Sequence, residues 1–504
     1  MIELDGHHLT LEQLSTVADE RERVALSADA RRRTNAARAV VDRAVERGEP
    51  VYGVNTGFGS FAEIRIAQDD LHALQLNLLR SHAAGIGEPL SRRAVRATML
   101  LRANVLACGY SGIRAETLDA LIALLNAGVR PHIPRRGSVG ASGDLAPLAH
   151  LALVLVGEGQ AFVDSRHVDG AEALRAAGLT PVVLQAKEGL ALINGTQPST
   201  AVLALALLDA ERLARTADIA AALSIDALRG SSRPFDSRIH EARGFTGQSR
   251  AADNILRLLA GSGINASHAN CGRVQDAYSM RCAAQVHGAA RDALSWVRQT
   301  AEIEANAATD NPMVFAGTDE ILSGGNFHGA PVALAADVLA IAVTQLATIS
   351  ERRAERLVNP ALSGLPAFLT RAGGLQSGLM MAQVSAAALT SELKVLAHPA
   401  CVDSIPTSAN KEDHVSMSMA AALKAERAVD LARHVLAIEM LCAVQAIDLL
   451  APLETSAALA RVHGAVRAHV ATLHEDRPPS PDIAALETLI ARGDIERAAD
   501  ITVN

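Results

Sequence analysis

Aromatic side chains, lysine and cysteine are all scarce in this sequence of 504 residues. Phe, Tyr and Trp together make up 2% of the chain, whereas hydrophobic residues reach 49%. Any core must therefore consist mainly of alanine, leucine and valine, which suits closely packed helices. Four lysines leave few candidates for a Schiff base. The five cysteines lack CxxC spacing, which indicates reduced thiols in a cytoplasmic protein rather than a disulfide framework.

Several features that point to large partners or to a membrane are also missing. The formal charge is −8 and the sequence has no basic cluster, which argues against nucleic-acid binding. The N-terminus, MIELDGHHLTLEQL, has neither the basic start nor the apolar block of a signal peptide. No uninterrupted apolar run is long enough to span a bilayer. We therefore expect a soluble protein with a small-molecule partner and no membrane association.

Helical periodicity dominates the rest of the chain. Apolar residues recur with helical spacing in the N-terminal segments 28–47, 69–82, 92–107 and 115–126, and in longer segments at 188–228, 282–308, 328–357, 374–397 and 411–450. A less regular stretch at 157–186 is compatible with a small hairpin. Long helices rich in Ala and Leu cannot cover their apolar stripes alone, so they predict an all-α fold with a helical bundle, shared between subunits.

The segment Gly137–His150, GSVGASGDLAPLAH, places Ala-Ser-Gly between glycines and the start of an apolar helix, with Asp144 in its first turn. A nucleophile elbow needs a glycine where Asp144 stands, and a phosphate-binding loop needs a following lysine. A third interpretation is backbone condensation: the Gly143 nitrogen attacks the Ala141 carbonyl, and loss of two waters leaves a methylidene-imidazolone. The tripeptide alone is common, and a plain glycine-rich turn also explains it.

Four polar clusters interrupt the apolar helices. Taken singly, each is explained by helix caps and by polar ties between helices. A metal site at Glu412, Asp413 and His414 is disfavoured because adjacent residues point in different directions, so we expect no metal. The clusters are NGTQ (194–197), QDAYSMRC (275–282), GGNFHG (324–329) and NKEDH (410–414).

In this order, with YGVNTGFG at 52–59, the motifs resemble the aromatic amino acid ammonia-lyases that use a methylidene-imidazolone, over about residues 52–419. The resemblance implies a carbon–nitrogen lyase with a fumarase/aspartase-like central bundle. We expect residues 1–200 to form a smaller N-terminal domain that carries the Tyr and Ala-Ser-Gly loops. Residues 201–504 would form the long-helix bundle, the C-terminal helical region and the oligomerisation core. A homotetramer with shared active sites is also implied.

The resemblance implies a role for each candidate site residue. Ala141, Ser142 and Gly143 would fuse into 4-methylidene-imidazol-5-one, so that no external cofactor is needed. Tyr52 would be the base that removes the β-proton, and Arg281 would hold the substrate carboxylate. The residues that would line the substrate and the electrophile are Asn194, Gln275, Tyr278 and Phe327.

His82 and Glu412 match the positions that contact the imidazole side chain in the histidine-specific members. A polar Ser81-His82 pair and a nearby carboxylate suit imidazole better than a phenyl ring. The implied reaction is elimination of ammonia from L-histidine to give trans-urocanate, the first step of histidine degradation. Lys411 stands where Gln is frequent in the family, which leaves the detailed role of Glu412 open. The alternatives are a tyrosine or phenylalanine ammonia-lyase, a related aminomutase and, more remotely, a non-catalytic helical scaffold.

Overall fold

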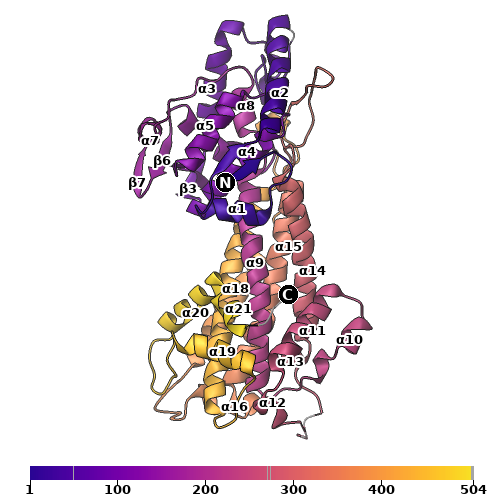
Figure 1. Ribbon diagram of the computed structural model, residues 1–504, viewed down its shortest axis with the longest axis vertical. Coiled ribbons are helices and arrows are strands. Elements are labelled where there is room, and N and C mark those ends of the chain that lie inside the picture. Colours follow the sequence, from indigo (N-terminus) through magenta and orange to yellow (C-terminus); the bar gives the residue numbers. More distant parts are fainter. Residues whose placement is uncertain (49, 270, 273, 501–504) are drawn as a thin grey trace. The chain divides into compact units, whose positions relative to one another are not determined.

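The computed structural model describes residues 1–48, 50–269, 271–272 and 274–500, which form two compact units (Figure 1). The first unit comprises residues 1–205, 298–337 and 399–423, and the second comprises 206–297, 338–398 and 424–504. A division at residue 200 would assign 298–337 and 399–423 to the bundle, but both segments belong to the first unit. Chain segments far apart in sequence therefore build that unit together.

The predicted all-α class is confirmed, and most helix bounds fall within a few residues of the predicted ones. Serine caps define several N-termini: the Ser27 hydroxyl accepts from the Ala30 amide, and the following helix ends at Gly48, whose φ is +67°. The α-helices with most or all of their residues in the first unit are α1 Leu11–Ala18, α2 Ala28–Arg47, α3 Leu71–His82, α4 Arg92–Ala107, α5 Ala115–Asn126, α6 Leu145–Leu155, α7 Gly170–Ala176 and α8 Glu188–Ile193.

Short strands in the first unit form four small sheets. β1 (Ile2–Leu4) pairs in parallel with β2 (Val24–Leu26). The other pairs are antiparallel, and the possible hairpin at 157–186 is present as β6 and β7. The antiparallel strands are β3 Ile86–Pro89 with β5 Pro134–Arg136; β4 Arg130–Pro131 with β6 Gln160–Val163 and β7 Arg166–Asp169; and β8 Met313–Phe315 with β9 Glu320–Leu322.

Four long helices, α9 (Gln197–Ala227), α14 (Ala283–Ala305), α15 (Ala330–Val358) and α18 (Ser418–Leu449), run side by side in the second unit (Figure 1). Each also has residues in the first unit. The remaining α-helices of the second unit are α10 Ser237–Glu241, α11 Thr246–Leu259, α12 Gly263–Ala266, α13 Tyr278–Arg281, α16 Pro360–Ser363, α17 Met380–Leu396, α19 Ala457–Arg467, α20 Ser480–Arg492 and α21 Asp494–Ala499. Short 3-10 turns are η1 Gly59–Phe61, η2 Gln68–Asp70, η3 Arg233–Phe235, η4 Ala367–Leu369 and η5 Ser408–Asn410.

A buried charge network ties the four long helices together. Arg353 on α15 makes a two-pronged ion pair with Glu439 on α18, and both side chains are fully buried. Arg353 Nη1 also lies 3.5 Å from His287 Nε2, while His287 Nδ1 lies 2.7 Å from the Asp218 carboxylate. Burial lowers the pKa of His287. A neutral imidazole that donates from Nδ1 to Asp218 and accepts from Arg353 at Nε2 satisfies every partner.

The predicted single helical segment at 188–228 is divided into α8 and α9 by Asn194-Gly195-Thr196. A Cβ atom on Gly195 would lie 2.4 Å from Gln197 Oε1 and 2.5 Å from Arg102 Nη1, so only glycine fits this crossing. The helical periodicity of the segment concealed this break.

Helix α15 is long and apolar enough, by length and composition alone, to cross a membrane. In its most apolar 18-residue window, 72% of the residues are buried inside the protein. It is the only such helix in the described part of the chain. That burial is typical of a core helix.

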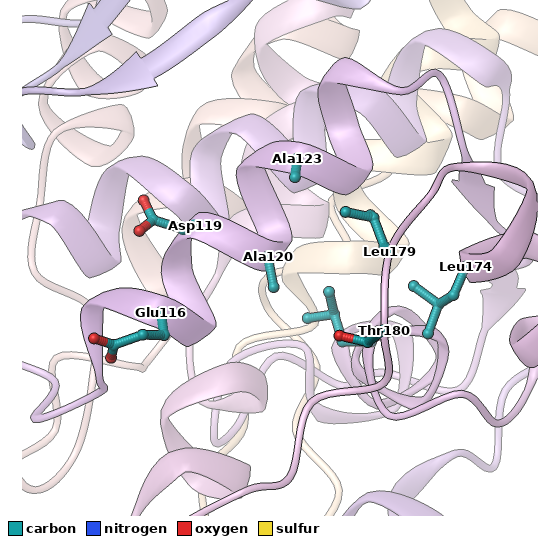
Figure 2. Close-up of a pocket in the computed structure, with 8 residues that line it drawn as sticks. Glu116, Asp119, Ala120, Ala123, Leu174, Leu179 and Thr180 are labelled. Atoms are coloured by element: carbon teal, nitrogen blue, oxygen red, sulfur yellow. The ribbon is translucent and has the colours of Figure 1, made fainter.

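A hollow of about 280 Å³ on the first unit is lined mainly by apolar side chains from α5, from α7 and from the segment after α7 (Figure 2). The carboxylates of Glu116 and Asp119 lie on the opposite side of the view from Leu174 and Leu179. Arg31 already pairs with Asp119. None of the predicted site residues lines this hollow.

The buried thiols yield a prediction for the whole fold. Burial raises the pKa of Cys108 to about 11 and that of Cys442 to about 12, while Cys271 is exposed. Because the thiolate is the reactive form, we expect a disulfide reagent at neutral pH to modify Cys108 and Cys442 more than about 100-fold more slowly than Cys271. Peptide mass spectrometry after timed labelling measures this. Denatured protein, in which all five thiols react, is the control; rapid labelling of native Cys442 would contradict the fold.

Candidate active site

The Ala-Ser-Gly loop is held against the break between α8 and α9. The Asp144 amide donates to the Gly195 carbonyl oxygen at 2.8 Å, and Gly143 forms a backbone bridge with Gly195. A Cβ atom on Gly143 would lie 2.1 Å from that same carbonyl oxygen, and its φ is +68°. No residue with a side chain fits there without displacing the backbone. The loop is therefore a forced structure rather than a flexible linker.

Asp144 stabilises a different helix from the one that the sequence predicted. It precedes α6 but makes no side-chain cap bond to it. Its carboxylate instead accepts from the Ser138 hydroxyl at 2.5 Å and from the Ser199 amide, in the first turn of α9, at 2.8 Å. Burial raises the pKa of Asp144, and the bonds from Ser138 and Ser199 oppose that rise. The carboxylate thus fastens both ends of the loop to α9.

Ser142, Glu412 and Asn194 are brought together by direct contacts, as the sequence predicted for one site. The Ser142 hydroxyl donates to Glu412 Oε1 at 2.9 Å, and Asn194 Nδ2 donates to the Ser142 carbonyl oxygen at 3.3 Å. Thr407 donates to the other Glu412 oxygen at 2.6 Å and so fixes the carboxylate. The buried Oδ1 of Asn194 has no hydrogen-bond partner within the described residues. Its acceptor is therefore available to a ligand.

A buried arginine binds the main-chain carbonyl oxygen of Asn194. Arg102 on α4 is fully buried, and its Nη1 donates to the Asn194 carbonyl oxygen at 2.9 Å and to Gln197 Oε1 at 2.7 Å. Its Nη2 donates to the Ala191 carbonyl oxygen. Burial lowers the pKa of Arg102 to about 10, so the guanidinium stays charged at neutral pH. The last carbonyls of α8 are thereby fixed by a cation, which suits the negative end of a helix.

Phe327 lies in a turn that contacts the Ala-Ser-Gly loop at Gly140. The Gly329 amide donates to the Gly140 carbonyl oxygen at 3.2 Å, and the Ser416 hydroxyl donates to the same oxygen at 2.8 Å. Phe327, two residues before Gly329, is half-buried. Segments 327–329 and 416–417 therefore meet at Gly140, as expected if both contribute to one site.

Tyr52 lies in a turn that packs on α8. A Cβ atom on the next residue, Gly53, would lie 2.5 Å from Leu190 Cδ2, so the turn sits directly on the helix that ends at Asn194. The Tyr52 ring meets Phe58 edge-on with centroids 6.4 Å apart. Asn55 Oδ1 closes the turn by accepting from the Val51 amide at 2.8 Å. The phenol is half-buried, and its oxygen accepts from the Gly59 amide at 3.5 Å.

His82 ends α3 in a defined tautomer. Its Nδ1 lies 2.9 Å from the Leu78 carbonyl oxygen, which can only accept, so Nδ1 carries a proton. Burial lowers the pKa of His82, and the carboxylate of Glu412 is close enough to oppose this shift. The lowered pKa favours the neutral ring, whose unprotonated Nε2 can accept a hydrogen bond.

Gln275, Tyr278 and Arg281 belong to the second compact unit, whereas the Ala-Ser-Gly loop belongs to the first. Arg281 Cζ lies 4.6 Å above the Tyr278 ring, a cation–π arrangement. Its buried Nε has no partner among the described residues. Tyr278 is 70% exposed. Arg353 donates to the Ser279 carbonyl oxygen at 3.3 Å, which ties this turn to the buried network of the bundle.

Sequence reasoning missed the residues that position the site. Two of them, Arg102 and Thr407, lie outside the polar clusters. Ser138 lies in the Gly137–His150 segment, but no motif or spacing assigns it a role. For Asp144 the sequence predicts only a place in the first turn of the helix that follows it.

The described residues contain no group of three or more His, Cys, Asp or Glu side chains placed to hold a metal.

The sequence of this chain matches the model of a known protein family. The profile of the family described as aromatic amino acid lyase matches residues 9–468. The chain belongs to this family.

Individual relatives narrow the comparison. The chain is 58% identical over 502 residues to the histidine ammonia-lyase of Anaeromyxobacter sp. (strain K), covering 98% of this chain and 99% of that one. A crystal structure of histidine ammonia-lyase from Trypanosoma cruzi is 45% identical, with a TM-score of 0.92 and coverage of 99% and 95%. Tyrosine aminomutase from Streptomyces globisporus is 38% identical, with a TM-score of 0.95 and full coverage of both chains.

The contact between Gly143 and Gly195 predicts an unusual sensitivity to one methyl group. Gly143→Ala should lower the melting temperature far more than Gly178→Ala. Both glycines have similar φ values, +68° and +70°, but Gly178 has no atom within 4 Å of an added Cβ. The control therefore measures the backbone strain alone, about 1 kcal/mol, and the excess measures the clash, about 1–3 kcal/mol. Scanning calorimetry gives both values, and equal losses would contradict the described loop.

Proposed function

We propose that the protein is a histidine ammonia-lyase, which eliminates ammonia from L-histidine to give trans-urocanate. The observation that carries this proposal is the 58% identity, over nearly the full length of both chains, to a histidine ammonia-lyase. The geometry agrees with it: the Ser142–Glu412 contact lies beside a neutral His82. The reaction breaks one carbon–nitrogen bond and releases no redox equivalents, so no external electron acceptor is needed.

We further propose that Ala141, Ser142 and Gly143 cyclise to 4-methylidene-imidazol-5-one. The Gly143 nitrogen would bond to the Ala141 carbonyl carbon, whose oxygen leaves as water. The Ser142 hydroxyl and its α-proton leave as a second water. Three features support the fit: Gly143 has no side chain to obstruct closure, Glu412 accepts from the departing hydroxyl, and Asn194 binds the Ser142 carbonyl oxygen. Once formed, the group supplies an electrophilic carbon for the amine of the substrate.

The side chains of this protein would then supply binding and proton transfer. Tyr52 is proposed as the base that takes the β-proton, because it is a half-buried phenol in a turn that packs on α8, the helix next to the loop. Arg281 is proposed to bind the substrate carboxylate, a task that suits its unpartnered buried Nε and planar fork. Gln275, Tyr278, Asn194 and Phe327 are proposed to line the substrate.

The preference for histidine is proposed to come from His82 and Glu412. An imidazole substrate has an N–H donor that can bind the free Nε2 of His82 or a carboxylate oxygen of Glu412. A phenyl side chain offers neither partner a hydrogen bond, so the polar groups would be desolvated without compensation. This chemistry favours histidine over phenylalanine.

Shared active sites in a homotetramer are part of the proposal. Tyr278 is 70% exposed and Val274 is 95% exposed, although a binding residue and an apolar neighbour should be covered in a working site. Another copy of the chain would cover them. The five unpaired thiols support a reducing compartment, and we propose a cytoplasmic location.

Tyr52→Phe tests the base assignment. We expect turnover of histidine, followed by the ultraviolet absorbance of urocanate, to fall about 10²–10⁴-fold, because the general base is lost. The intact mass should still be two waters below that expected for the unmodified chain. Ser142→Ala is the matched variant, and its mass should lack that loss. Substantial activity in Tyr52→Phe would refute its role, and an unmodified wild-type mass in an active preparation would refute the cyclised group.

The nearest rival is a lyase or aminomutase that acts on tyrosine or phenylalanine, since tyrosine aminomutase shares the fold with a TM-score of 0.95. Offering all three amino acids to the wild type and to His82→Leu separates these functions. We expect the wild type to prefer histidine and His82→Leu to lose about tenfold or more of that preference. Formation of a β-amino acid, or a wild-type preference for tyrosine, would establish the rival.

Mixing two inactive variants tests the shared sites. Tyr52→Phe and Arg281→Gln chains, each inactive alone, are coexpressed with different tags and purified through both. If a site takes Tyr52 and Arg281 from different chains, about one site in four is intact, and activity should recover to roughly a quarter of the wild-type value. No recovery in verified mixed oligomers would place both residues of a site on one chain.

A further inference from the structure

Four arginines from separate parts of the first unit surround a cavity of about 290 Å³ that contains none of the proposed catalytic residues. Arg23 immediately precedes β2, and Arg130 is the first residue of β4. Arg92 and Arg96 lie in the first two turns of α4. Glu20 and Asp164 also reach the wall. The volume is close to the lower end of small-molecule sites, about 300 Å³.

One carboxylate serves two of these guanidinium groups. Arg92 Nε donates to Glu20 Oε1 at 3.0 Å, and Arg96 Nη1 lies 3.6 Å from the same oxygen. Arg96 is almost fully buried, and its guanidinium donates to the main-chain carbonyl oxygens of Val17 at 3.0 Å and Leu125 at 3.1 Å. Two cations therefore share a single negative charge at the base of the cavity.

The other two arginines form no ion pair with a carboxylate of the described residues, although the charge of Asp164 acts on Arg130 and partly offsets the lowering of its pKa by burial. Arg23 makes no side-chain hydrogen bond or ion pair within the described ranges. Arg130 donates to the main-chain oxygen of Asp164 and lies over the Phe162 ring at 5.7 Å, without forming an ion pair to a described residue. Glu22, at the cavity edge, is engaged by the α-ammonium group of Met1 at 2.6 Å. Four guanidinium groups therefore line the cavity with three carboxylates, those of Glu20, Glu22 and Asp164, and one of these three is already paired with the ammonium group of Met1. The cavity thus has an excess of positive charge.

The guanidinium groups also lower one another's pKa. Burial lowers the pKa of Arg96 to about 10, and the charges of Arg92 and Arg130 contribute to the fall. Burial and then Arg92 also lower the pKa of Arg130. An anion bound among the four groups would relieve this repulsion and replace the missing counter-charge.

We propose that this cavity binds a dianionic phosphate group, carried either by inorganic phosphate or by a small phosphomonoester. Planar guanidinium forks match the oxygen geometry of phosphate and bind it with two parallel hydrogen bonds. Arg23 and Arg130 would supply the contacts that are free, and Arg92 and Arg96 would supply the fixed positive field behind them. The ester would occupy volume beyond the phosphate itself.

Calorimetric titration of the full-length protein tests the site. The chain needs a C-terminal tag, because the free α-ammonium group of Met1 holds Glu22. Inorganic phosphate, glycerol 2-phosphate and succinate are titrated separately just above neutral pH, where phosphate is mainly dianionic, at constant ionic strength. We expect saturable binding of phosphate or its ester with one site per chain, and weaker binding of the dicarboxylate.

Arg23→Gln and Arg130→Gln should each weaken phosphate binding about tenfold, as expected for the loss of one charge-assisted contact. Arg21→Gln is the matched control: it removes the same charge two residues away, from a side chain that is 74% exposed and outside the cavity. Its affinity should equal that of the wild type. Deamination without phosphate should be unchanged in all three variants. The melting temperature should be unchanged in Arg21→Gln and Arg23→Gln, whereas Arg130→Gln also loses its contacts with Asp164 and Phe162.

Each outcome decides the proposal. Tighter binding of the ester than of free phosphate identifies a phosphomonoester as the ligand class, and the reverse identifies inorganic phosphate. No saturable binding of either up to about 10 mM would overturn the site. An equal loss of affinity in Arg21→Gln would show a general charge effect and would also overturn it. Succinate binding as tightly as phosphate would overturn the assignment to phosphate.

Discussion

The close approach of the Gly143 and Gly195 backbones is the constraint on which the site depends. The Gly195 carbonyl oxygen accepts from the Asp144 amide at 2.8 Å and occupies the space that a side chain on Gly143 would need. Arg102 fixes the same break from inside by binding the carbonyls of Ala191 and Asn194. The loop is consequently held in a single conformation by contacts made on both sides of one backbone crossing.

Local pattern was sufficient to predict the helices but not their interruptions. The ends of α2 were predictable because Ser27 and Gly48 are strong capping residues. The NGTQ cluster indicates an interruption near Gly195, but the crossing itself could not be predicted, because Arg102, which is far away in the sequence, fills the space beside Gly195. The contribution of 298–337 and 399–423 to the first unit likewise depends on tertiary contacts that no local periodicity encodes.

The candidate site divides in the same way. The chemistry of Ser142 and Glu412 could be inferred from motifs, and the structure brings these two side chains to 2.9 Å. Their supports could not be inferred, since Thr407 and Ser138 are ordinary polar residues whose importance lies in one hydrogen bond each. Reacting groups are constrained by their chemistry, whereas positioning groups are constrained only by where the fold places them.

The arginine cavity extends this reasoning to charge. The sequence has no basic cluster, because Arg23, Arg92 and Arg130 are tens of residues apart. The fold nevertheless brings them, together with Arg96, to one cavity that is lined by four arginines and three carboxylates. A net charge of −8 therefore describes the whole chain but not its local fields. The orphan oxygen of Asn194 is buried, so it has a desolvation cost that a bound donor would offset. Arg23 is exposed, and its charge is solvated rather than buried. The orphan oxygen requires a hydrogen-bond donor and the arginine cavity requires negative charge, so each place indicates what a ligand must bring.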